Sequence, residues 1–98
     1  MPVGQQGIAN LYQKPLGYVQ QTSLGSAVNL SSIPARATMC VITVEGNGIR
    51  WRDDGSDPTA SVGMPVSNGQ TFSYTGNMNA LRIIQQAASA TINVTYYA

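Results

Sequence analysis

The sequence predicts an all-β fold, an antiparallel β-sandwich that is jelly-roll-like and carries an extended N-terminal arm. Short runs rich in threonine, valine, isoleucine and aromatic residues recur from Gly17 to the end of the chain. Turn residues separate these runs at hairpin-length spacing, so about seven or eight strands fit into the chain. We assign residues 1–14 to the arm and residues 15–98 to one β-sandwich domain, because a chain of 98 residues supports a single core.

The arm is polar and glycine-rich, and its apolar side chains are scattered. A segment of this composition cannot build a core alone. Ile8, Leu11 and Tyr12 are therefore the candidate anchors through which the arm contacts another surface. Packing on its own domain and reaching onto a neighbouring subunit both fit this composition.

The strongest predicted strand covers residues 38–45. It is apolar on both sides over its middle, which predicts a central strand covered on both faces. The turn at residues 46–48 contains the Asn-Gly pair that is typical of a tight hairpin. We therefore expect residues 49–52 to return beside the first strand as its hairpin partner.

The other predicted strands are short. Alternation is clearest near the end of the chain, where Ile92, Val94 and Tyr96 share one face, as in a half-buried antiparallel strand. Residues 53–59 are expected to form a turn, and residues 60–66 a connection. The remaining strands are expected at residues 18–22, 27–30, 71–75, 80–86 and 90–97.

The composition argues against several classes of function. Histidine is absent and Cys40 is the single cysteine, which removes histidine-based triads, most zinc sites and an intrachain disulfide. A net charge of +1 provides no basic field for nucleic acid. No apolar stretch approaches the roughly 18 residues that span a membrane, and the N-terminus lacks the pattern of a signal peptide. We expect a non-enzymatic protein without catalytic residues, cofactor, metal, nucleic acid or membrane partner, made in a cytoplasm.

The region around Trp51 contains the candidate binding residues. Alternation places Trp51 on one face of its strand and both Arg50 and Arg52 on the other. These side chains could stack on a sugar or contact a partner, whereas a tryptophan that shares a face with Ile49 is more often part of the core. The acidic turn at residues 53–57 lacks the ligand spacing of a calcium loop, and its arginine neighbours predict local ion pairs.

Charge is scarce along the whole chain. Charged residues make up 9% of the sequence, against roughly 25% in typical soluble domains. Residues 15–35 and 83–98 contain none. We expect much of this surface to contact protein, in a closed homo-oligomer that is a trimer or, as the alternative, a pentamer.

Short segments between residues 41 and 97 form a distinctive string. They are VEG at residues 44–46, IRWRDDG at 49–55, PTASVGMP at 58–65, YTG at 74–76, LRII at 81–84 and NVTYY at 93–97. The string resembles small proteins encoded in tailed-phage structural gene clusters, namely capsid decoration (cement) proteins and the bases of head spikes or fibres. The resemblance does not cover the arm.

The resemblance implies a non-enzymatic virion structural protein. Its expected partners are the major capsid protein or other virion proteins, and its expected place is the capsid exterior, after synthesis in the bacterial host cytoplasm. The alternative is a carbohydrate-binding module of a tail or spike, with Trp51 and the tyrosines as stacking platforms.

Overall fold

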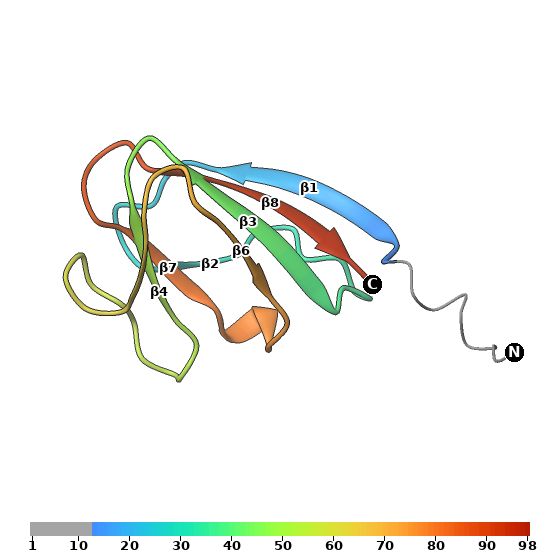
Figure 1. Cartoon of the computed structure of the whole chain (residues 1–98). Coiled ribbons are helices and arrows are strands. Elements are labelled where there is room, and N and C mark those ends of the chain that lie inside the picture. Colours follow the sequence, from blue (N-terminus) through green and yellow to red (C-terminus); the bar gives the residue numbers. More distant parts are fainter. Residues whose placement is uncertain (1–12) are drawn as a thin grey trace, which may run out of the picture.

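The structure, a computed structural model, describes residues 13–98 and consists of two antiparallel four-stranded sheets (Figure 1). In spatial order, the first sheet contains β1 (Pro15–Gln21), β8 (Thr91–Tyr97), β3 (Met39–Glu45) and β6 (Thr71–Tyr74). The second contains β2 (Val28–Asn29), β7 (Arg82–Gln85), β4 (Ile49–Arg52) and β5 (Met64–Val66). A 3₁₀ turn, η2 (Met78–Ala80), precedes β7. The predicted all-β fold with two antiparallel sheets is confirmed.

The core lies between the inner faces of the two sheets. In β3 and β8 every second side chain is buried, as the period-two alternation of a strand requires. One apolar cluster joins these side chains to those of β4 and β7, and a fully buried aliphatic side chain contributes about 1.5–3 kcal/mol. The sheets are therefore held face to face in a sandwich-like arrangement. The fully buried members include Cys40, Ile42, Val44, Ile49, Leu81, Ile83, Ile92 and Val94.

The predicted hairpin at residues 46–48 is wrong. Strand β3 pairs with β8 and β6, whereas β4 pairs with β7 and β5, so the connection carries the chain from one sheet to the other. It lies against the connection from β7 to β8, which crosses at the same end (Figure 1). Asn47 Nδ2 donates to the Ala88 carbonyl (2.5 Å), and the Gln86 N–H donates to the Gly48 carbonyl (2.9 Å). The Asn-Gly pair thus serves a crossover between sheets rather than a tight turn.

Two further expectations need correction. Residues 64–66 of the expected connection form the edge strand β5, where Pro65 is tolerated because an edge strand can lack one ladder donor. Strand β3 is central, between β8 and β6, but its outer side chains Met39 and Val41 are only half-buried. Within residues 13–98, no further sheet or helix covers the outer face of β3, so the predicted burial on both faces is wrong.

The first strand begins earlier than expected. Strand β1 starts at Pro15, and Lys14 exchanges backbone hydrogen bonds with Ala98 (2.7 and 2.9 Å). The long partner strand β8 draws residues 15–17 into the ladder, with an irregularity between Pro15 and Gly17. The rest of the predicted arm, residues 1–12, lies outside the described residues.

Gly46 is required by the crossover. Its φ is +85°, and a Cβ atom there would overlap the carbonyl oxygen of Ser89. We expect Gly46→Ala to lower the free energy of unfolding by at least about 2 kcal/mol, since left-handed strain and steric overlap add. Gly55→Ala is the matched control, because Gly55 has a φ of +91° and no atom within 4 Å of that position. Equal losses in urea unfolding of the two variants would contradict the close approach.

Candidate functional site

The outer face of the first sheet is covered with amide and hydroxyl side chains. Side chains that alternate with the buried ones point outward, and the strand register aligns them in rows across β1, β8, β3 and β6. One row is Gln20, Asn93, Thr43 and Thr71, and the next is Tyr18, Thr95, Val41 and Ser73. We call these two rows the amide–hydroxyl face.

Asn93 organises the amide–hydroxyl face. Its Oδ1 accepts hydrogen bonds from the Tyr18 hydroxyl (2.6 Å) and from Gln20 Nε2 (3.0 Å). Its Nδ2 donates to Glu45 Oε2 (2.6 Å), and Glu45 is the one charged residue in the four strands of this sheet. The bonded side chains are thus held in place on a surface that is nearly free of charge.

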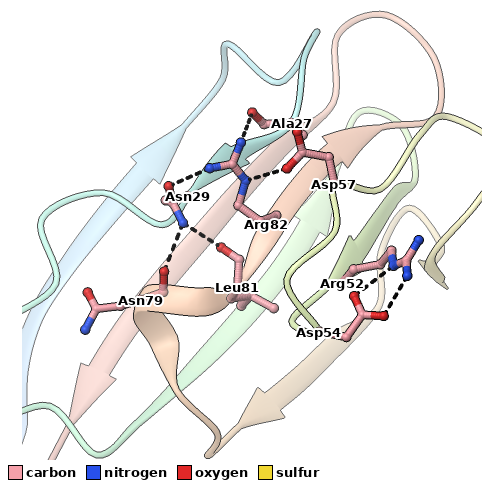
Figure 2. A network of polar contacts seen from close by, with 8 residues as sticks. All are labelled: Ala27, Asn29, Arg52, Asp54, Asp57, Asn79, Leu81 and Arg82. Carbon is pink, nitrogen blue, oxygen red and sulfur yellow. Dashed lines mark hydrogen bonds and ion pairs between the residues drawn. The ribbon is translucent and has the colours of Figure 1, made fainter.

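The outer face of the second sheet has the opposite character. Arg52 of β4 and Arg82 of β7 are directly opposite each other in the register, an arrangement that repels unless each charge is compensated. Arg52 forms a two-pronged ion pair with Asp54, with Nε–Oδ1 and Nη2–Oδ2 distances of 3.0 and 2.6 Å (Figure 2). Hydrogen bonding to Arg52 holds the pKa of the Asp54 carboxyl below its ordinary value. The expected local ion pair beside the acidic turn is confirmed for these two residues.

Arg82 joins three segments of the chain (Figure 2). Its Nε lies 3.0 Å from Asp57 Oδ1 in an ion pair that lacks an aligned N–H hydrogen bond. Its Nη1 donates to Asn29 Oδ1 (2.9 Å), and its Nη2 donates to the Ala27 carbonyl (3.2 Å). Asn29 in turn donates to the Asn79 carbonyl (3.1 Å). The guanidinium therefore ties β7 to β2 and to the connection between β4 and β5.

Arg50 binds the backbone of the same connection, residues 53–63. Its Nε and Nη1 donate to the carbonyls of Ala60 (3.2 Å) and Gly63 (2.8 Å). Pro58 is buried, and the Gly63 backbone approaches Pro58 and Arg50 closely. The three arginines of this sheet thus fasten residues 53–63 to its outer face.

Trp51 packs between the two sheets. Its ring stacks parallel on Phe72 of β6, with centroids 6.0 Å apart and an interplanar angle of 7°. It meets Tyr74 edge-on at 5.8 Å, and the Tyr74 hydroxyl donates to Asp53 Oδ2 (2.6 Å). Burial, followed by the contact with Asp53, raises the pKa of Tyr74 to about 12. This aromatic group closes the edge of the sandwich where β5 and β6 lie.

The structure brings some of the predicted site residues together. The two ends of residues 53–63 lie beside Trp51, Arg50 and Arg52. Each of these three side chains already contacts other residues of the chain, through ring stacking for Trp51 and hydrogen bonds for the arginines. Contact of these residues with another molecule stays a prediction. Ile8, Leu11 and Tyr12 lie outside the described residues.

The amide–hydroxyl face was not predicted from the sequence. The alternation of residues 91–97 already placed Asn93 and Thr95 away from the core. Their alignment with Gln20, Tyr18 and Thr43 depends on strand pairing between distant segments, which no local pattern reveals.

Groups that could support catalysis or metal binding are scarce in the described part of the chain. Cys40 is buried, and burial raises the pKa of its thiol to about 11, which suppresses the reactive thiolate. Residues 13–98 contain no group of three or more metal-ligating side chains. Within the same residues, no helix has the length and hydropathy to cross a membrane.

We expect Trp51→Ala to lower the free energy of unfolding by about 3 kcal/mol, because the indole bridges β4 and β6 across the sandwich. Tyr18→Ala is the matched aromatic control, since Tyr18 is 62% exposed and outside the core. Urea unfolding of both variants measures the two losses. A loss for Trp51→Ala no larger than that for Tyr18→Ala would contradict the bridging role.

Stability should fall at high pH because two tyrosines titrate late. Burial raises the pKa values of both Tyr74 and Tyr96 to about 12, above the unfolded value of about 10. Folding favours the neutral phenol, so this contribution is complete below pH ~10 and is lost as the pH rises toward 12. Between about pH 9 and 11.5, we expect the unfolding free energy of the double variant Tyr74→Phe, Tyr96→Phe to decline less steeply than that of the unmodified protein. An unchanged slope would contradict this assignment.

Comparisons with models of known protein families, with curated proteins and with solved structures found no match to this chain.

Proposed function

We propose that this protein is a non-enzymatic virion structural protein of a tailed phage, a capsid decoration (cement) protein or the base of a head spike. The motifs quoted above motivate the assignment, and the amide–hydroxyl face is the observation that carries it. That face is nearly free of charge and is held in place by Asn93. A partner protein that covers it desolvates little charge, because Glu45 is the one charged residue in these four strands and its carboxylate already accepts from Asn93; unpaired charge is the main cost of burying polar surfaces.

The strand order supports a jelly roll as the finer description of the sandwich. Only β4 and β5 are consecutive strands within one sheet; every other step along the described chain changes sheet. The orders β1-β8-β3-β6 and β2-β7-β4-β5 agree with the two four-stranded sheets expected of an eight-stranded jelly roll, and we propose this topology. Viral capsid and lectin domains both use this architecture, so the fold agrees with the proposal without selecting it.

The proposed action is stabilisation by binding. Decoration of an assembled capsid favours that state over loose subunits by mass action. The major capsid protein, or another virion protein, is the proposed partner, and a stable contact needs about 800 Å² on each side. We propose a closed homo-oligomer, a trimer or a pentamer, so that several copies of the face bind at once.

We expect Thr95→Lys to abolish binding to capsids that lack this protein, while the domain stays folded. Thr95 is central in the amide–hydroxyl face, and an unpaired ammonium buried at an interface costs several kcal/mol, which weakens binding by more than about 100-fold. Co-sedimentation measures the binding, and a thermal melt checks folding.

Ser56→Lys is the matched control, because it adds the same charge at an exposed position of residues 53–63. Retained binding by Thr95→Lys would exclude the amide–hydroxyl face as the docking surface. Failure of the unmodified protein to bind any capsid preparation would overturn the proposed function itself.

A further inference from the structure

A hollow of about 390 Å³ lies at the edge of the second sheet, beside β4 and β5. Its apolar wall consists of Trp51, Val62 and Met64. Val62 and Met64 are 53% and 55% exposed, and they belong to the three most exposed large apolar side chains of residues 13–98. We call this feature the Trp51 hollow; its size lies within the range of sites that take small ligands.

The polar side of the Trp51 hollow offers both acceptors and donors. Asp53 uses Oδ2 to accept from Tyr74, and within residues 13–98 its Oδ1 has no hydrogen-bond donor. Arg52 donates from Nε and Nη2 to the Asp54 carboxylate, and its Nη1 has no acceptor within the same residues. The residues that line the hollow thus offer a carboxylate oxygen and a guanidinium nitrogen that have no partner within residues 13–98, beside an aromatic ring.

These groups select against charged ligands. A cation would lie close to the Arg52 guanidinium, and an anion close to the carboxylates of Asp53 and Asp54. A neutral molecule with several hydroxyl groups donates to Asp53, accepts from Arg52 and places its C–H surface against Trp51 and Met64. We propose that the Trp51 hollow binds a neutral saccharide.

The wall of the hollow is fastened before any ligand arrives. Arg50 holds the Gly63 carbonyl at 2.8 Å, and the Gly63 backbone follows directly on Val62. The indole of Trp51 is stacked on Phe72. Ordered walls reduce the entropy that a ligand must overcome on binding. The hollow is separate from the amide–hydroxyl face, so the saccharide site does not depend on the proposed docking to a capsid.

The test uses the single tryptophan of the chain, whose indole N–H gives one assignable NMR signal. Neutral di- and trisaccharides of hexoses and N-acetylhexosamines are titrated into the full-length protein, beside a lysine-rich peptide and a sulfated disaccharide. We expect at least one neutral saccharide to shift the indole signal saturably. Met64→Ala and the double variant Arg52→Gln, Asp54→Asn should each weaken this binding at least about tenfold.

Asp57→Asn is the matched control, because it removes the other aspartate ion pair of this sheet but does not border the hollow. It should leave saccharide binding unchanged. Three results would each overturn the proposal: no neutral saccharide shifts the indole signal, the shift persists in both hollow variants, or only the charged probes bind. A thermal melt of each variant separates lost binding from lost folding.

Discussion

The packing of β3 and β8 against β4 and β7 is the interaction on which the other features depend. Each of these strands turns its apolar side chains into one cluster, and side chains such as Ile42 and Val94 are completely buried there. Because neighbouring side chains of a strand point to opposite faces, this burial determines which residues face outward. Asn93 and Thr95 face solvent because Ile92 and Val94 do not.

The two outer faces stabilise their polar groups by different means. On the first sheet, neutral side chains bond to one another around Asn93. On the second, Arg52 and Arg82 lie opposite each other, and aspartates from residues 53–63 compensate both charges. The aspartates of the acidic turn therefore compensate the charges of the arginines beneath them. Because the same segment is held on the sheet, its residues form part of the wall of the Trp51 hollow.

Local patterns predicted most strands but not their partners. The alternation of Ile92, Val94 and Tyr96 needs only a few neighbouring residues, so the sequence predicted the inward face of β8 correctly. The Asn-Gly pair is typical of a tight hairpin and therefore led to the wrong prediction. Turn residues indicate where the chain bends, but they do not determine which strands pair afterwards. Strand β5 was missed because it is short and contains Pro65, which is tolerated only once the strand is known to be at an edge. The sequence predicted ion pairs between the acidic turn and its arginine neighbours; Arg52 forms one with Asp54, whereas Arg50 donates to backbone carbonyls instead. The ion pair of Arg82 with Asp57 was missed, because only the fold brings these two residues together.

The scarcity of charge has a consequence for how such a surface can bind. Exposed ion pairs contribute only about 0–1 kcal/mol, and salt screens them, so residues 53–63 depend more on the backbone bonds of Arg50 and the burial of Pro58. The amide–hydroxyl face is nearly free of charge, so the docking proposed for it would lack electrostatic steering, and association rates of about 10⁵–10⁶ M⁻¹s⁻¹ are typical of such cases. Affinity must then come from shape, hydrogen bonds and the number of faces engaged together. If several such faces are linked in the proposed oligomer, they gain most from a partner that presents identical sites at matching spacing, because one bound face raises the effective concentration of the others.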